Sequence, residues 1–152
     1  MVEHEHTIRL LEDMGLQTAA NLLHAKLDEA SRSEGMTFLG FLHSLLEEEN
    51  AARKRRSEET RLRLSRLPAR KTLDEFDFDF QPSIDKAQIN ELATLVFAER
   101  NNNILFLGPP GVGKTHLAIG LALKAIENGM TVYFTTLSHM MQDLQKPDYT
   151  TG

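Results

Sequence analysis

The chain of 152 residues contains no cysteine, no apolar run of membrane-spanning length and no internal repeat. Without cysteine it can form neither a disulfide framework nor a thiolate zinc site. The apolar run at 104–107 is far shorter than the ~20 residues that cross a bilayer. The first six residues are acidic and polar, whereas a secretory signal would begin with basic and then apolar residues. We therefore expect a cytoplasmic protein with no membrane partner.

Basic residues are scarce overall but concentrated in one stretch. The net charge is −5, whereas residues 53–71 contain nine lysines and arginines against two glutamates, a local charge of +7. Such a run could neutralise the phosphates of DNA, or it could be only a solvated helix face. Basic residues on several faces of a helix suit contact with the DNA backbone better than base reading. The predicted DNA contacts are Arg53, Lys54, Arg55, Arg56, Arg61, Arg63 and Arg66.

Residues 1–68 have the pattern of a helical module. Apolar residues recur at spacings of three and four up to Leu27, with a joint expected at Gly15. After a polar break, the spacing predicts a second amphipathic helix over about 37–66, capped by Thr37. This part of the chain should therefore form a helical hairpin.

The stretch 69–83 is predicted to be a linker arm. Phenylalanine and aspartate alternate over Phe76–Phe80, which is the period of a short half-buried strand. Ser83 can then cap a helix over 84–100, which begins the last predicted domain, 84–152.

Two short apolar runs flank a central helix in that last domain. We predict strands at 104–107 and 132–135, each apolar enough to be buried on both faces of a parallel sheet. The helix between them is expected over 114–127, with Gly129 as a left-handed stop, and Ser138 should cap a last helix. Strand, helix and strand form one parallel crossover unit. The predicted fold class is α/β, a helical module followed by an incomplete parallel-sheet domain.

A glycine-rich loop joins the first predicted strand to the central helix. Residues 108–115, GPPGVGKT, fit the pattern of glycine, four residues, then Gly-Lys-Ser/Thr. In such a P-loop, glycines let amides point at phosphates, lysine reaches the outer phosphates, and threonine binds Mg²⁺. A chance turn is the alternative, but the position between an apolar run and a helix favours a nucleotide site, most simply for ATP with Mg²⁺. The predicted site is Gly108, Gly111, Val112, Gly113, Lys114, Thr115 and His116, with Thr115 as the metal ligand.

The sequence around this loop resembles a known family. Residues 105–118, with the stretch 72–83 before them and 132–136 after them, resemble the IstB-like ATP-binding helper proteins of insertion-sequence transposition. The resemblance runs from about Arg70 to Leu144. It implies an AAA+ ATPase that assembles on double-stranded DNA and assists a transposase. It also implies that the N-terminal helices serve DNA binding and self-association.

The resemblance further implies elements that should follow Leu144. Family members continue into a strand with paired acids, then a polar sensor residue and an arginine supplied to the neighbouring subunit, and the last eight residues contain none of these. We therefore expect a fragment or shortened form that binds ATP but hydrolyses it poorly, and we assign no catalytic residue. The two predicted strands are not neighbours in the AAA+ sheet, so they should lack their pairing partners.

The leading functional hypothesis is an ATP-binding transposition helper that binds duplex DNA and assists a transposase. A helicase loader of the DnaC type shares the loop, and a helicase partner would then replace the transposase. A non-catalytic nucleotide-dependent binding or oligomerisation module is a second alternative, and a frame-shifted remnant without a stable fold is a third. Apart from His116, which is expected to pack near the phosphates, the histidines lack the spacing of metal ligands.

Overall fold

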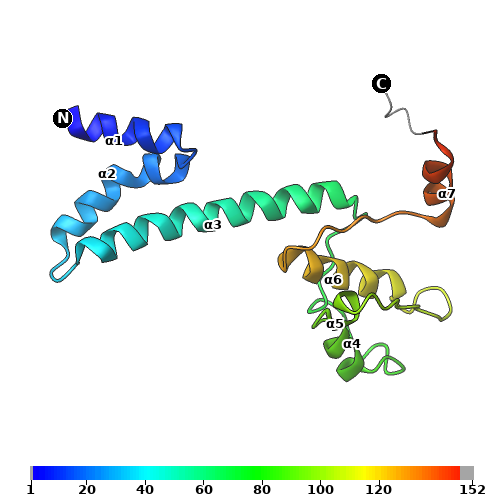
Figure 1. The fold of residues 1–152 in the computed structure, drawn as a ribbon. Coiled ribbons are helices and arrows are strands. Elements are labelled where there is room, and N and C mark those ends of the chain that lie inside the picture. The colour runs from blue at the N-terminus through cyan, green and yellow to red at the C-terminus, as the bar shows by residue number, and fades with distance from the viewer. Residues whose placement is uncertain (1, 148–152) are drawn as a thin grey trace. The chain divides into compact units, whose positions relative to one another are not determined.

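The chain divides into two compact units. A computed structural model describes residues 2–147. The units are Met1–Ser57 and Glu58–Gly152, and the division falls inside helix α3 (Phe38–Ser65) (Figure 1). Within 2–147 no helix is long and apolar enough to span a membrane. The domain limits inferred from the sequence, at residues 68 and 83, stay predictions.

The first unit is built from helices α1 (Val2–Asp13), α2 (Gln17–Arg32) and the first part of α3. Gly15, with φ of 73°, makes the joint between α1 and α2. Thr37 Oγ1 accepts a hydrogen bond from Gly40 N at 3.0 Å and so caps α3. The predicted helices, joint and cap are therefore confirmed. The buried core consists of Ala19, Leu23 and Leu45.

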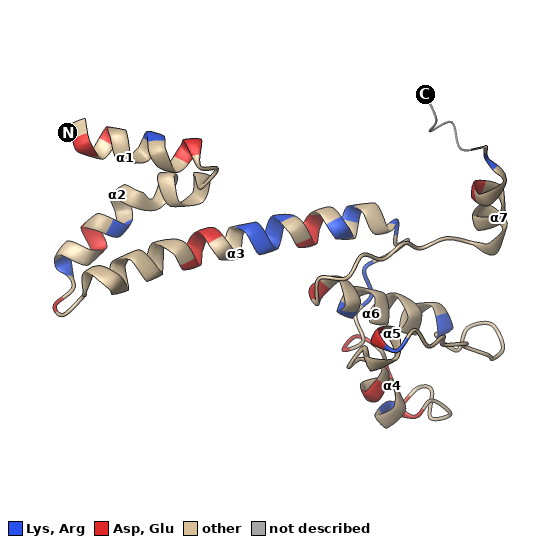
Figure 2. Ribbon diagram, in the orientation of Figure 1, with Lys and Arg blue, Asp and Glu red and all other residues tan. Residues whose placement is uncertain are grey.

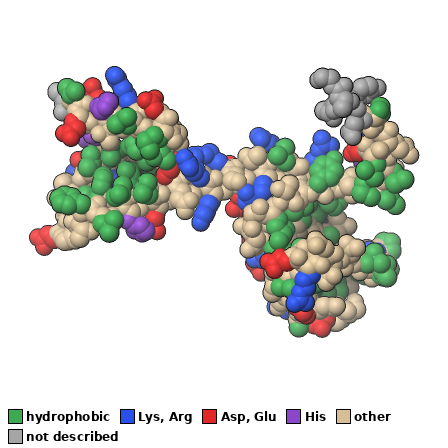
Figure 3. Space-filling model, in the orientation of Figure 1, with side chains coloured by type: hydrophobic (Ala, Val, Ile, Leu, Met, Phe, Trp, Pro, Cys, Tyr) green, Lys and Arg blue, Asp and Glu red, His purple; other side chains and the backbone are tan. Residues whose placement is uncertain are grey.

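Apolar side chains are not confined to this core. Figure 3 shows hydrophobic side chains gathered over the N-terminal helices. On α3, Phe38 is 98% exposed and Leu39 is 75% exposed, while Leu42 and Leu46 are nearly half exposed. The first turns of α3 therefore carry an apolar face that the described chain leaves open to solvent.

The start of α2 is closed by a side chain from another helix. Leu16 holds the N-cap position and provides no side-chain cap of its own. Instead, Ala19 N donates to Glu49 Oε2 at 2.8 Å, although Glu49 lies thirty residues further along, on α3. Because first-turn amides have no intrahelical partner, the carboxylate satisfies a group that would otherwise be buried and unpaired.

Glu49 is itself almost fully buried, with 3% of its surface exposed. Burial alone would raise the pKa of its carboxyl, but hydrogen bonds from the amides of Ala19 and Thr18 and the nearby Arg56 guanidinium outweigh it and lower the pKa. The charged form is therefore favoured in the fold. Arg53 Nε and Arg56 Nη2 lie 3.7 and 3.5 Å from Glu49 Oε1.

The second unit is organised around α6 (Lys114–Glu127), which matches the helix predicted from the sequence. Most of its apolar side chains are buried, and Leu117 joins a core cluster with Phe76 and Ile89. Gly129, with φ of 84°, ends the helix as predicted. The amides of Gly129 and Met130 bond back to Ile126 and Ala125, the pattern of a Schellman stop.

Two helix predictions need correction. The helix expected over 84–100 is two helices, α4 (Lys86–Leu92) and α5 (Val96–Glu99). Leu95 lies between them with a φ of 65° and is 4% exposed, so burial of its side chain outweighs helix propensity there. The cap of α4 is Asp85 rather than Ser83, since Asp85 Oδ1 accepts from the amide of Ala87 at 2.9 Å.

The last helix, α7 (Leu137–Gln145), also begins earlier than expected. Its cap is Thr136 rather than Ser138, and Thr136 Oγ1 accepts from His139 N at 3.2 Å. The residue that caps a helix is the one whose backbone is still extended while its side chain reaches the amide two or three positions on. Thr136 meets that condition, with φ of −87° and ψ of 155°.

The predicted strands at 104–107 and 132–135 are not confirmed, because none of residues 2–147 is in a strand. In the first run, Leu105 and Leu107 are 80% and 82% exposed. In the second run, the amide of Phe134 donates a hydrogen bond to the carbonyl oxygen of Ser65 at 2.6 Å and not to residues 104–107. A strand exists only where a neighbouring strand receives its ladder of hydrogen bonds, and the two runs do not supply each other. The parallel sheet is therefore not confirmed.

The alternating segment Phe76–Phe80 likewise forms no strand, and its residues 78–80 are a turn. Asp77 Oδ1 accepts from the amides of Asp79 and Phe80 at 3.0 and 3.1 Å. A short acidic side chain that bonds to the backbone just after it offers those amides an alternative to a sheet ladder. The arm thus bends, and Phe76 is buried while Phe80 is exposed.

Candidate functional site

The glycine-rich loop leads directly into α6. Gly111 and Gly113 have φ of 84° and 90°, in the left-handed region that glycine enters without steric cost. A Cβ at Gly111 would meet nothing within 4 Å, so the requirement there is conformational. A Cβ at Gly108 would lie 3.2 Å from Val112 Cγ2, which shows how tightly the loop is closed.

The first turn of α6 lacks the side-chain cap that α3, α4 and α7 have, as does the four-residue helix α5. Helices α3, α4 and α7 are capped by the side chains of Thr37, Asp85 and Thr136. Gly113 holds the N-cap position of α6 and offers no side chain, so within the described chain α6 begins without one. The open amides and the positive end of the helix dipole together favour an anion at this point.

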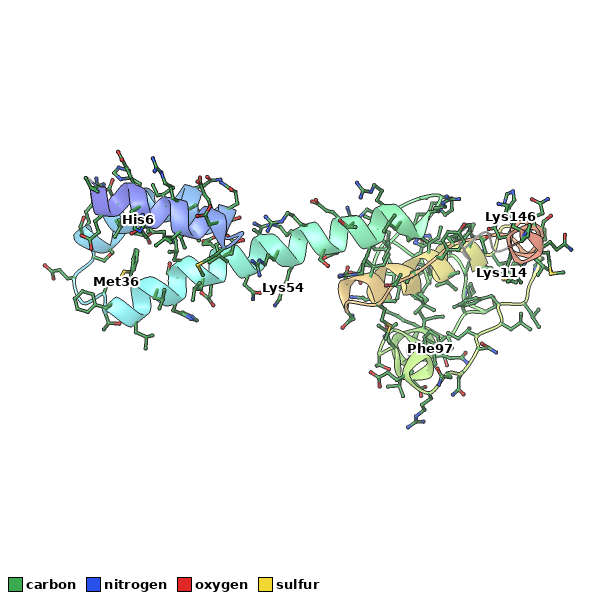
Figure 4. All side chains as sticks on the ribbon, turned by 45° about the horizontal axis from the view of Figure 1, so that its top comes forward. His6, Met36, Lys54, Phe97, Lys114 and Lys146 are labelled. Carbon is green, nitrogen blue, oxygen red and sulfur yellow. The ribbon has the colours of Figure 1, made fainter. Side chains whose placement is uncertain are left out.

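Lys114 contributes the cation of the loop. Its Nζ donates to the carbonyl oxygen of Gly108, so the ammonium bridges the first glycine of the motif to the first residue of α6 (Figure 4). Thr115 follows with an exposed side chain. The two polar side chains that the motif requires therefore lie at the same helix end as the open amides.

A cavity of about 370 Å³ lies beside the loop. It is bounded by α4, by the extended run before the loop and by the start of α6. Its volume is within the range of small-molecule sites. Lys114 and Asp85 bring opposite charges to its wall, which also includes Ser83, Ile89, Phe106, Gly108 and Leu117.

The described residues contain no group of three or more His, Cys, Asp or Glu side chains arranged to hold a metal ion. A magnesium ion at this loop would therefore depend on the hydroxyl of Thr115 and on oxygens of the bound phosphates. This fits the usual habit of Mg²⁺, which takes few protein ligands and keeps phosphate and water oxygens.

His116 is engaged with the arm before α4. Its Nε2 lies 2.8 Å from the carbonyl oxygen of Thr72 and donates to it, since a carbonyl can only accept. Its ring also meets that of Phe76 edge to face, with centroids 5.2 Å apart. In this structure the ring is thus a packing group, and the predicted phosphate contact of His116 stays a prediction.

Sequence reasoning missed Phe76. A Cβ at Gly113 would overlap Phe76 Cε2 and lie 3.1 Å from its Cζ, so the ring lies directly against the loop. The alternation of phenylalanine with aspartate signalled an apolar face on the arm. It contained no information about which part of the chain that face would cover.

The predicted DNA contacts differ in whether they are engaged with other groups; Figure 2 shows lysines and arginines in blue along α3. Arg61 Nη2 donates to the carbonyl oxygen of Ile126 at 3.0 Å, and the Arg66 guanidinium lies 5.7 Å from the ring centroid of Tyr133. Arg53 and Arg56 are paired with Glu49, as described above. Lys54, Arg55 and Arg63 are exposed and enter neither an ion pair nor a cation–π contact within 2–147. Arg66 is exposed as well but lies against the Tyr133 ring.

Comparison with known proteins places the chain in a family. Residues 9–150 match the family described as IstB-like ATP binding protein. An ATP-binding protein of insertion sequence IS5376 from Geobacillus stearothermophilus is 45% identical over 146 residues, 95% of this chain and 56% of its own length. The corresponding protein of IS21 from Pseudomonas aeruginosa is 42% identical over 90% of this chain and 51% of its own length. The chain therefore belongs to the IstB-like ATP-binding protein family, and it spans about half the length of these relatives.

Proposed function

We propose that this chain binds ATP with Mg²⁺ at residues 108–115 and acts as the nucleotide-binding part of a helper in insertion-sequence transposition. The observation that supports it best is the first turn of α6, which has no side-chain cap. The loop that leads into this turn contains glycines in left-handed conformations. The chain also belongs to the IstB-like ATP-binding family. Relatives named for insertion sequences favour transposition over helicase loading.

Each part of the loop has a proposed role. Amides of the loop and of the first turn of α6 would hold the phosphates. The Lys114 ammonium would leave the Gly108 carbonyl for the outer phosphate oxygens, to which it can make stronger charge-assisted bonds. The Thr115 hydroxyl would bind Mg²⁺. Bound ATP supplies the negative phosphate oxygens that these groups meet.

The proposal includes duplex DNA and a transposase as partners, with self-association in the intact family member. Lys54, Arg55 and Arg63 are the side chains best disposed for DNA, because they are exposed and form neither an ion pair nor a cation–π contact within the described chain. They would meet backbone phosphates with little sequence preference.

The finer fold also belongs to the proposal. We infer an AAA+-type parallel sheet for the whole family domain, in which 104–107 and 132–135 would be strands once further strands pair with them. The division into a DNA-binding module over 1–68, an arm over 69–83 and a nucleotide-binding core over 84–152 is proposed with it.

The test is Mg-ATP binding by Lys114→Ala, measured by calorimetry. Removing the cation should weaken affinity by roughly tenfold to a hundredfold, because a hydrogen bond to a charged group is worth about 1.5–3 kcal/mol. Lys124→Ala is the matched control: it removes a lysine from the far end of the same helix, where Lys124 pairs with Glu127 at 3.7 Å. Equal affinities for the two variants would contradict the assignment of the site.

A further inference from the structure

The arm before α4 lies along one face of α6. Gly113, His116 and Gly120 follow one another at spacings of three and four, so they share a face of the helix. Leu73 and Phe76 of the arm cover the two glycines, and the Thr72 carbonyl accepts from His116 between them.

The approach is close enough to require glycine at both ends of this face. A Cβ at Gly120 would lie 2.5 Å from Leu73 Cδ2 and 3.1 Å from the backbone nitrogen of Leu73. A Cβ at Gly113 would overlap the Phe76 ring. At Gly120 the arm touches the middle of α6, but at Gly113 it touches the phosphate loop itself.

Phe76 is firmly held in that position. It is 9% exposed and belongs to the cluster with Ile89 and Leu117. Its ring meets the rings of Phe78 and His116 edge to face, at centroid distances of 4.8 and 5.2 Å. The Phe76 ring is therefore held in place by its neighbours and packs against Gly113, whose backbone has no side chain of its own to restrict it.

We propose that Phe76 is a positioning residue for nucleotide binding: its ring holds Gly113 in the left-handed conformation that aims the α6 amides and Lys114 at the phosphates. The inference depends on the proposed nucleotide site. Glycine occupies many backbone conformations with similar ease, so an unsupported Gly113 would leave the binding conformation for much of the time. If Phe76→Ala reduced the population of that conformation to about one tenth, affinity would fall about tenfold.

The experiment compares Phe76→Ala with Leu73→Ala in the full chain. Both remove an apolar side chain of the same arm from the same face of α6, but only Phe76 touches the loop. Three quantities are measured: Mg-ATP affinity by calorimetry, melting temperature without nucleotide by circular dichroism, and hydrogen exchange of the amides at 111–114 by mass spectrometry.

We expect both variants to melt at lower temperature. Phe76→Ala should bind Mg-ATP about tenfold more weakly and exchange faster at 111–114, whereas Leu73→Ala should stay within about twofold of wild type on both measures. Phe76→Leu, which keeps a smaller apolar side chain at this position, should lie between wild type and Phe76→Ala, with a loss of affinity of about threefold. Equal loss of affinity in Phe76→Ala and Leu73→Ala, or unchanged exchange at 111–114 in Phe76→Ala, would overturn the inference.

The two proposals fail in different ways. If wild type does not bind Mg-ATP, the proposed function fails, while the exchange comparison at 111–114 still decides whether Phe76 restrains the loop. If Phe76→Ala does not fold, Phe76→Leu decides, with an expected loss of about threefold and faster exchange. Wild-type exchange in that folded variant would count against the proposal.

Discussion

Helices α2 and α6 begin with the same unsatisfied backbone groups and treat them in opposite ways. The first turn of α2 is closed by a buried carboxylate from α3, through the bond from Ala19 N to Glu49. The first turn of α6 follows a glycine and has no such cap. A helix N-terminus attracts negative charge in both cases. In α2 the chain supplies that charge itself, and in α6 we propose that a nucleotide supplies it.

The difference suggests a general principle: a cap stabilises a helix start, and it would also compete with an anion for the same amides. Glu49 ties α2 to α3 and draws Arg53 and Arg56 toward itself. A comparable side chain at the start of α6 would occupy the amides that a phosphate needs. Stability in the first unit and the proposed nucleotide binding in the second would thus depend on the same kind of backbone group.

Removing the charge of Glu49, which caps α2, should lower the free energy of unfolding more than the other replacements below. Glu49→Gln should lower the free energy of unfolding of the first unit by about 1.5–3 kcal/mol, because a buried charge-assisted bond to Ala19 N is weakened and two arginines lose their counter-charge. Chemical denaturation followed by circular dichroism measures the loss. Glu48→Gln is the control, since Glu48 is half exposed and pairs with Lys26 at 3.8 Å; it should cost less than ~0.5 kcal/mol.

The same carboxylate predicts how stability responds to acid. The pKa of Glu49 is lowered in the fold, so its contribution is complete above the ordinary glutamate pKa and is lost as pH falls through the lowered value. The difference in unfolding free energy between wild type and Glu49→Gln should therefore shrink with falling pH below that ordinary pKa. A difference that stays constant across this range would show that the charge of Glu49 is not what closes α2.

Removing an ordinary side-chain cap should have a smaller effect. Thr136→Ala takes away the hydroxyl that accepts from His139 N and should cost about 1 kcal/mol, felt as fraying of α7. Helical circular dichroism and exchange of the α7 amides report it. Ser138→Ala is the control, because Ser138 is not the cap. A larger loss from Ser138→Ala would reverse the assignment of the cap.

Charged side chains that cap no helix and form no ion pair, such as Lys54 and Arg55, should contribute least to the free energy of unfolding. Replacing Lys54 and Arg55 by Ala should change the free energy of unfolding by less than ~0.5 kcal/mol. The same pair should weaken binding to duplex DNA of any sequence and reduce the slope of log K against log salt by ~0.9 for each DNA phosphate that is no longer neutralised. Arg9→Ala with Arg32→Ala, on α1 and α2, is the matched control. DNA affinity unchanged by the Lys54 and Arg55 replacements would remove these residues from the proposed interface.

The parts of the molecule predicted correctly are those set by nearby residues. The limits of α6, the stop at Gly129 and the Thr37 cap each depend on groups within a few positions of one another. The predicted helix over 84–100 failed at Leu95, where burial of one side chain turned the backbone against its local preference. The apolar runs at 104–107 and 132–135 form no strand within residues 2–147, because strand formation depends on a partner strand and not on the run itself.

By itself the sequence determined the phosphate-loop motif, the positions of the main helices and membership of the family, since glycine spacing and apolar periodicity act over short distances along the chain. Only the tertiary structure decided which helix start is closed and which is open. Glu49 reaches Ala19 across thirty positions, and His116 reaches Thr72 across forty-four. Phe76 likewise packs against Gly113, which is distant from it in the sequence. Such contacts form because folding brings distant side chains to the same point, and no local pattern in the chain specifies where that point is.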